Sequence, residues 1–246
     1  MKTLGRVLIG LVVCASFSLI LMRVFWMQPF NIPAGSMIPT VLIGDNILVS
    51  KTAYGYSRYS FPFGKNINYF SGRMWGKEPK LGDVAVFRSV AEPGTDFIKR
   101  VVGLPGDRIQ IKKGILHINS VPCPLEPAGE FETVNNDGTI LKAPQFIEML
   151  PNGLKHSIVK QIPFGEGRYD NTAYFDVPPG HYFMLGDNRD ASNDSRVQGL
   201  IGYIPLENLV GRASFVFFTT GSHASLLEPE NWSLKADYNR IGQGIH

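Results

Sequence analysis

The chain has 246 residues, 44% hydrophobic and 18% charged, so most of it can fold around a hydrophobic core. The net charge is only +3 and the 24 basic residues are spread along the chain, which excludes the basic patch of a nucleic-acid-binding protein. The 26 glycines and 17 prolines are typical of a β-rich fold with many turns. The two cysteines stand in unlike settings, which argues against a disulfide framework.

The N-terminus is apolar. Residues 7–22 carry no charge and stand between Arg6 and Arg23. With its apolar flanks, the stretch from about residue 4 to 27 is long enough to cross a bilayer core, which takes roughly 20 residues. Positive charge before the stretch predicts a cytoplasmic N-terminus, with everything after about residue 28 on the outer face. The alternative is a cleaved signal peptide, but Arg23 follows the apolar run where a small-x-small site should come.

The rest of the chain is predicted to be mainly β. β-branched and aromatic residues alternate, or run between glycine and proline turns, in eight segments. These are residues 46–49, 83–88, 97–104, 108–111, 115–118, 173–177, 181–185 and 210–218. A short helix is predicted at 204–209 or in the tail after Pro229.

Two stretches interrupt this pattern. Residues 54–75 are rich in aromatic side chains, which either rest on the bilayer surface or fill a local core. Residues 112–172 are looser, with a hairpin signal at Asn136, Asp137 and Gly138. We therefore predict an anchor at 1–28, a main β core at 29–111 and 173–221, a smaller β insertion at 112–172 and a tail at 222–246.

Ser36 lies in the sequence Ile-Pro-Ala-Gly-Ser-Met-Ile-Pro-Thr, residues 32–40. Prolines on both sides and a glycine hold such a serine in a rigid turn, with its backbone N–H free to face a ligand. That arrangement suits a nucleophile beside an oxyanion site. Turns of this composition are also common without any function, so the segment alone leaves both interpretations open.

Lys99 lies in the predicted strand 97–104. Side chains alternate along a strand, so Phe97, Lys99 and Val101 share one face. A lysine buried among apolar neighbours has a lowered pKa and can act as a general base near neutral pH. The alternative is an edge strand from which Lys99 reaches water.

Residues 186–196 read Gly-Asp-Asn-Arg-Asp-Ala-Ser-Asn-Asp-Ser-Arg. Seven of the eleven are Asp, Asn or Arg. They form either a solvated turn held by local side-chain hydrogen bonds or a network of carboxylate–guanidinium pairs that braces a site.

In this order, and behind one apolar N-terminal segment, the three segments resemble the bacterial type I signal peptidases, a family of Ser–Lys dyad proteases. The resemblance covers nearly the whole chain. It rests on Gly-Ser-Met-Ile-Pro-Thr (35–40), Ile-Lys-Arg-Val-Val-Gly-Leu-Pro-Gly-Asp (98–107) and the segment 186–196, with further similarity at 82–87 and 240–246.

The resemblance implies roles for particular residues. Ser36 attacks the scissile carbonyl, Lys99 accepts its proton, and Ser192 hydrogen-bonds Lys99. Asp194 and Arg196 pair to hold their loop, while Asp187 and Arg189 are structural. The residues implied around the substrate, including the pockets for small side chains at its −1 and −3 positions, are Ile32, Ala34, Met37, Phe97 and Ile98.

Ala34 departs from the family pattern. Gram-negative members often have a serine there, whose hydroxyl helps to form the oxyanion hole, and some relatives have glycine. With only a methyl group at this position, the backbone N–H of Ser36 has to serve, alone or with another donor.

The resemblance further implies an all-β ectodomain of antiparallel sheets, with few short helices, behind one N-terminal transmembrane helix. The expected activity is removal of signal peptides from exported preproteins after small-x-small sites, with no cofactor or metal. The expected partners are these preproteins and the phospholipid bilayer, and no nucleic acid. The expected location is the bacterial inner membrane, single-pass, with the catalytic domain on the periplasmic face.

The sequence also allows other interpretations of the protein's function. A Ser-His-Asp triad would draw on one of four histidines, and a zinc peptidase is disfavoured because no HExxH spacing occurs. A specialised relative that cuts a single substrate and a non-catalytic membrane-tethered β module that binds extended peptides are two further alternatives. The histidines in question are His117, His156, His181 and His223.

Overall fold

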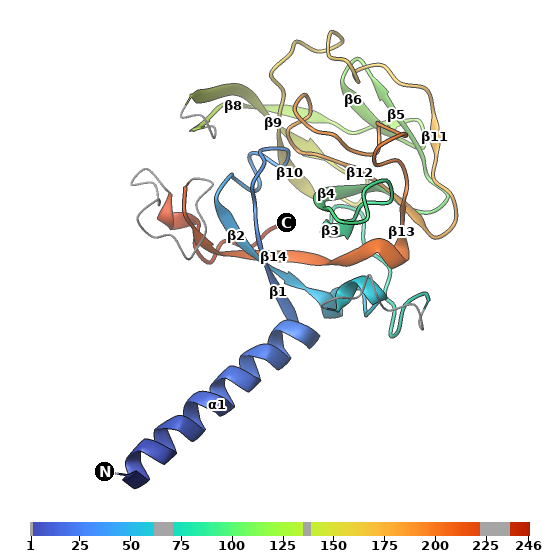
Figure 1. Ribbon diagram of the computed structural model, residues 1–246. Helices are drawn as coiled ribbons and strands as arrows, with labels where there is room; N and C mark the ends of the chain where they lie inside the picture. Colours follow the sequence, from blue (N-terminus) through green and yellow to red (C-terminus); the bar gives the residue numbers. More distant parts are fainter. Residues whose placement is uncertain (1, 62–70, 135–138, 222–236) are drawn as a thin grey trace.

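The computed structural model describes residues 2–61, 71–134, 139–221 and 237–246 (Figure 1). The hairpin signal at 136–138, much of the aromatic block 54–75 and His223 lie outside the described residues.

The chain begins with a 24-residue helix, α1 (Lys2–Phe25), which projects away from a body of β-strands (Figure 1). Side chains are described for only part of this helix. Within the described residues, no helix has the combination of length and apolar character that crossing a membrane requires.

The largest sheet has seven strands in the order β1-β2-β14-β3-β4-β12-β13. Every neighbouring pair in it is antiparallel. In chain order the strands are β1 (Met27–Asn31), β2 (Asp45–Ser50), β3 (Val84–Arg88), β4 (Asp96–Gly103), β12 (His181–Leu185), β13 (Ile204–Pro205) and β14 (Leu209–Thr219).

Two smaller antiparallel sheets complete the body. One has the order β10-β9-β8 and the other β11-β5-β6-β7. Their strands are β5 (Arg108–Lys112), β6 (Ile115–Ile118), β7 (Val121–Pro122), β8 (Leu125–Val134), β9 (Ile140–Met149), β10 (Lys155–Val159) and β11 (Phe175–Asp176). Single 3₁₀ turns lie at η1 (Lys51–Ala53), η2 (Arg58–Ser60), η4 (Leu206–Asn208) and η6 (Tyr238–Arg240). The expected β-rich antiparallel architecture with few short helices is therefore confirmed.

All eight predicted segments contain a strand, and several further strands carry prolines that weakened their signal. Pro29 lies in β1, at the edge of the large sheet, where a residue without an N–H is tolerated. Pro127 lies in β8, an edge strand whose register shifts between Pro127 and Glu130. The helix expected at 204–209 is only the 3₁₀ turn η4.

The four-stranded sheet joins parts that are distant in sequence. β5 precedes the predicted insertion and β11 follows it, yet Phe175 of β11 pairs with Ile109 of β5. The predicted division into core, insertion and tail therefore stays a prediction.

The turn that carries Ser36 is held from two sides. Met37 is fully buried in the main core cluster, together with Ile32 and residues of β2, β3 and β14. Ile38, only 1% exposed, instead packs with Ala143 of β9 and Val159 of β10. Consecutive side chains thus anchor the turn to the large sheet and to the three-stranded sheet, which fixes where Ser36 points.

Candidate active site

Ser36 lies in a tight turn stabilised by backbone hydrogen bonds. The Ile38 N–H donates to the Gly35 carbonyl over 3.2 Å, and the Val41 N–H donates to the Met37 carbonyl over 3.0 Å. Ser36 itself is partly buried, while Met37 and Ile38 are enclosed. The backbone of the serine is therefore set in place before any substrate arrives.

Lys99 approaches Ser36 from β4, an interior strand of the large sheet between β3 and β12. Its side chain is almost fully enclosed, with the residue 2% exposed. The Nζ atom donates to Ser36 Oγ over 2.7 Å and to the Ile98 carbonyl over 2.8 Å. The alternative of an edge-strand lysine that reaches water is therefore wrong, and the structure brings the two residues of the predicted dyad into direct contact.

Burial lowers the pKa of Lys99 to about 8, although the negative charges of Asp194 and Asp187 act in the opposite direction. The positive charge of Arg196 lowers it further. A lysine with such a pKa has a substantial neutral fraction near neutral pH, and its amine can then accept a proton from the neighbouring hydroxyl.

The loop 186–196 holds the backbone of the serine turn. Asn188 donates from its backbone N–H to the Ser36 carbonyl and from Nδ2 to the Gly35 carbonyl, each over 3.1 Å. A Cβ at Gly186 would lie 2.2 Å from Ser192 Oγ and 2.5 Å from the Ser36 carbonyl oxygen, so only glycine fits there. Sequence reasoning missed Asn188 and Gly186 as site residues.

Ser192 lies beside this contact but does not bond as expected. Its hydroxyl is buried and has no hydrogen-bond partner among the described residues. The predicted hydrogen bond from Ser192 to Lys99 is therefore not formed in this structure. The hydroxyl instead lies beside Gly186, at a place where an added Cβ would also meet the Ser36 carbonyl oxygen.

Asp194 and Arg196 form a buried ion pair with Nε–Oδ1 and Nη2–Oδ2 distances of 2.8 Å. Asp194 also accepts from the Gly186 N–H over 3.1 Å, and Arg196 Nη2 donates to the Arg189 carbonyl over 2.8 Å. The pair thus closes the loop on itself, which favours the network interpretation of this segment over the solvated turn.

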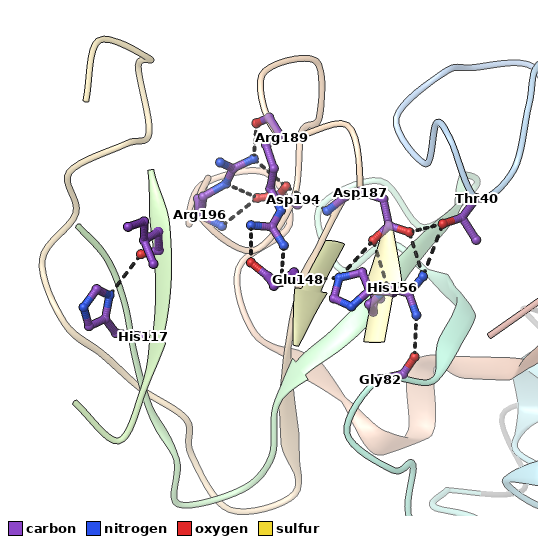
Figure 2. Close-up of polar contacts among 12 residues, drawn as sticks. Thr40, Gly82, His117, Glu148, His156, Asp187, Arg189, Asp194 and Arg196 are labelled. Atoms are coloured by element: carbon purple, nitrogen blue, oxygen red, sulfur yellow. Dashed lines mark hydrogen bonds and ion pairs between the residues drawn. The ribbon is translucent and has the colours of Figure 1, made fainter. Parts of the chain in front are cut away.

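Asp187 joins the loop to β4 and to the serine turn (Figure 2). Its carboxylate receives two hydrogen bonds from Arg100, of 2.9 and 2.7 Å, and one from the Thr40 hydroxyl of 2.5 Å. Arg100, which has no exposed surface, also donates to the Gly82 carbonyl. Asp187 is therefore the buried centre of a network that spans three segments of the chain.

Arg189 joins the loop to the three-stranded sheet. It donates twice to Glu148 of β9, over 2.8 and 2.5 Å, and both side chains are buried (Figure 2). Burial alone would raise the pKa of Glu148, but the charges and hydrogen bonds of Arg189 and His156 together outweigh burial, and the pKa falls to about 2. Glu148 was not predicted, because nothing in its surrounding sequence resembles a site motif.

His156 completes this buried cluster. Its Nε2 lies 3.3 Å from Glu148 Oε2 and 3.8 Å from Asp187 Oδ1. Burial and the charge of Arg100 lower the pKa of His156. Among the histidines that the structure describes, none hydrogen-bonds Ser36, so the triad alternative gains no support from the geometry.

The residues expected around the substrate lie in three different settings. Ile32, Met37 and Ile98 meet in one apolar cluster directly beside the dyad. Phe97 faces another cluster and stacks on Phe87, with ring centroids 6.0 Å apart. Ala34 is exposed.

Comparison with known proteins gives one consistent result. The sequence profile of the family described as signal peptidase, peptidase S26, matches residues 4–218. A signal peptidase I of Rickettsia canadensis is 43% identical over 248 residues, covering 96% of this chain and 90% of its own. A signal peptidase I of Rickettsia typhi is 42% identical over 215 residues, covering 84% and 79%.

Among solved structures, a signal peptidase I of Enterococcus faecalis is similar at 24% identity over 55% of this chain and 97% of its own. The TM-score of that match is 0.31.

Proposed function

This chain belongs to the signal peptidase family S26, and we propose that it removes signal peptides from preproteins with Ser36 as nucleophile and Lys99 as general base. It is a serine endopeptidase and a membrane-associated bacterial enzyme. The observation that carries the residue assignment is the 2.7 Å contact between Lys99 Nζ and Ser36 Oγ, made by a lysine that is 2% exposed.

The reaction needs only these two side chains for its proton transfers. Neutral Lys99 takes the proton of the Ser36 hydroxyl as Oγ bonds to the scissile carbonyl carbon. The tetrahedral intermediate then collapses, the peptide C–N bond breaks, and the Lys99 ammonium returns the proton to the leaving amine. Water, deprotonated by Lys99, attacks the resulting ester. The acyl C–Oγ bond then breaks, Ser36 Oγ takes the proton back from the Lys99 ammonium, and the signal peptide leaves with a free carboxyl group.

The negative charge that develops on the carbonyl oxygen requires donors. We assign the Ser36 backbone N–H to this role because its turn is fixed by buried neighbours on both sides. Ala34 carries no donor, so its side chain contributes only its small size to the substrate groove.

The remaining site residues are assigned supporting roles. Ser192, whose buried hydroxyl lies beside Gly186 and the Ser36 carbonyl, positions the Lys99 amine once substrate orders the site. Asp194 and Arg196 hold the loop, and Asp187 and Arg189 fix it to β4 and β9. Since all four of these charged residues are buried, each bond is formed in a setting of lower dielectric than water, which strengthens it.

Substrate binds as an extended segment along the strands that flank the dyad. Ile32, Met37 and Ile98 lie together beside Ser36 in one apolar cluster, and we assign them to the binding of small side chains at the −1 and −3 positions. Phe97, whose ring packs in another cluster, and the exposed Ala34 are assigned to the border of the same substrate site. This arrangement favours cleavage after Ala-x-Ala-type sequences.

The N-terminal segment is proposed as a single-pass anchor in the bacterial inner membrane, with the N-terminus cytoplasmic and the body on the periplasmic face. Residues 7–22 carry no charge, and Ile9, Leu11, Val12, Val13 and Phe17 are each at least 60% exposed along α1. Apolar side chains pointing in several directions from one helix suit contact with lipid.

Alanine replacement tests the dyad. Ser36→Ala and Lys99→Ala are expected to abolish cleavage of a preprotein in detergent while circular dichroism remains unchanged. His181→Ala serves as the control, because the one partner of its Nδ1 among the described residues is the Pro179 carbonyl, and it should cleave normally. Near-full activity of Lys99→Ala together with loss in His181→Ala would disprove the assignment. Binding of signal peptides without cleavage by the wild type would indicate the non-catalytic module instead.

A further inference from the structure

The C-terminal end of α1 is attached to the β body through one buried lysine. Lys51 follows β2 directly and has no exposed surface. Its Nζ donates to the carbonyls of Arg23 and Val24 in the last turn of α1, over 2.9 and 3.2 Å. The third bond of the ammonium goes to the Ser60 carbonyl over 2.5 Å.

The other terminal carbonyls of α1 are also taken by residues of the body or by the helix itself. The Tyr56 hydroxyl donates to the Phe25 carbonyl. The Lys51 backbone N–H donates to the Trp26 carbonyl over 2.9 Å, and the Trp26 N–H donates to the Met22 carbonyl over 2.8 Å. The last carbonyls of a helix normally lack intrahelical partners, and here the catalytic body supplies them.

The charge of Lys51 is balanced by these carbonyls rather than by an acid. In the described parts of the chain, no carboxylate forms an ion pair with it. The partial negative charge at a helix C-terminus favours a cation at that place. Lys51 therefore caps α1 by donating all three of its ammonium hydrogens to carbonyl oxygens.

Most of the connection from this cap to Ser36, residues 27–32, is held to β2 and Asp45 by backbone hydrogen bonds. β1 begins at Met27 and pairs with β2 along its whole length, from Met27 opposite Ser50 to Asn31 opposite Asn46. The Ile32 N–H then donates to the Asp45 carbonyl over 2.9 Å. A rotation of α1 relative to the sheet would have to break the cap or this ladder.

We propose that Lys51, supported by Tyr56, is a positioning residue that holds the membrane helix at a fixed orientation to the dyad and so determines which peptide bond of a membrane-held preprotein reaches Ser36. The inference rests on the proposed function and on the anchor role of α1. A signal peptide fixed in the bilayer presents its cleavage site at a set depth, so the catalytic serine must be held at a matching depth. Small displacements at a reacting centre are costly, on the order of 10²-fold in rate for 1 Å.

The test compares two substrates for Lys51→Met, which keeps the length of the side chain and removes its donors. One substrate is a soluble peptide spanning an Ala-x-Ala site. The other is a preprotein in vesicles of phosphatidylethanolamine and phosphatidylglycerol. We expect peptide cleavage within about twofold of wild type, and preprotein cleavage reduced by about tenfold or more with products displaced by one or more residues in mass spectra.

Two further variants complete the design. Lys77→Met removes an exposed lysine from a nearby segment and should match wild type on both substrates. Tyr56→Phe removes a single hydroxyl and should show the same preprotein-specific defect at smaller size, which keeps the test valid if Lys51→Met does not fold.

Equal loss on both substrates, or wild-type rates and cleavage positions on both, would overturn the positioning role of Lys51. Failure of the wild type to cleave either substrate would overturn the proposed function and, with it, this inference.

Discussion

Three lysines of the described residues lie almost completely inside the protein: Lys51, Lys99 and Lys160. Lys160 is paired with the carboxylates of Asp170 and Asp190. Lys51 and Lys99 form no such pair among the described residues, and they differ from each other in what surrounds the ammonium. Lys99 is 2% exposed and Lys51 0% exposed. Burial is the main cause that lowers the pKa of each to about 8, with Arg196 adding to the effect at Lys99 and Arg23 at Lys51. Burial and a lowered pKa therefore do not by themselves identify a catalytic lysine.

The two lysines differ in the hydrogen-bond partners of their Nζ atoms. Lys51 faces three carbonyl oxygens, which can only accept hydrogen bonds and so favour the ammonium form. Lys99 faces one carbonyl and the hydroxyl of Ser36, and that hydroxyl can donate to the neutral amine. The first environment suits a structural cation and the second a general base.

The largest expected effect comes from exchanging each lysine for arginine, which keeps the charge but cannot lose its proton. Lys99→Arg should lower kcat/KM for a soluble peptide by about 10³-fold or more, because no base remains. Lys51→Arg should change that value by less than about fivefold, since only a donor is needed there. Activity of Lys99→Arg close to wild type would show that the active site, like the helix cap, needs only a positive charge.

The next effect concerns the buried pairs that frame Lys99. Arg189→Met leaves Glu148 charged and buried without its main partner, and we expect the free energy of unfolding to fall by about 3–5 kcal/mol in urea titrations. Arg108→Met breaks the pair with Asp176, in which both side chains are at least 53% exposed, and should leave the free energy of unfolding nearly unchanged because solvent screens an exposed pair. Equal effects of the two replacements would mean that the network does not hold the loop.

The pH dependence of cleavage separates the two lysines directly. Only the neutral form of Lys99 accepts a proton, and its pKa is lowered to about 8. The kcat/KM for a soluble peptide should therefore fall about tenfold per pH unit below about pH 8 and level off above it. Lys51→Met should show the same midpoint, because Lys51 titrates without taking part in the chemistry. A midpoint that moves in Lys51→Met would show that Lys51, rather than Lys99, sets the pH dependence of cleavage.

The smallest expected effect is at the oxyanion site. Ala34→Ser adds a possible donor on an exposed position next to the serine turn. We expect kcat/KM to stay equal or to rise by up to about tenfold, measured on the same peptide. A loss of more than about tenfold would show that the oxyanion is held in another way and that the methyl group of Ala34 is needed for packing.

The strands and the dyad could be predicted because their signals are local. Alternation of apolar residues marked β4 and placed Lys99 among apolar neighbours, and the prolines around Ser36 marked its rigid turn. The strands β1 and β8 were missed because Pro29 and Pro127 interrupt them, and their places at sheet edges depend on neighbours distant in sequence.

The supporting residues were harder to predict. Glu148 and His156 come from β9 and β10 and meet Asp187 and Arg189 only through the packing of two sheets. Asn188 lies inside a recognised segment, but its bonds to the serine turn depend on a tertiary approach across 152 positions of sequence or more. The hydrogen bond expected at Ser192 shows the converse, because its residue type and place suggested a contact that the structure does not form.

The central claim is that burial lowers the pKa of Lys99 to about 8, so that a usable fraction of it is a neutral base near neutral pH, and its own titration tests this most directly. Selective ¹³C labelling of lysine Cε, with Lys99→Arg and Lys51→Arg used to assign the two shifted signals, allows each to be followed by NMR across pH. The account predicts that the Lys99 signal titrates with a midpoint near 8 and that this midpoint matches the pH profile of kcat/KM. A Lys99 midpoint at the ordinary lysine value of about 10.4 would contradict it, since the side chain would then remain an ammonium throughout the active range.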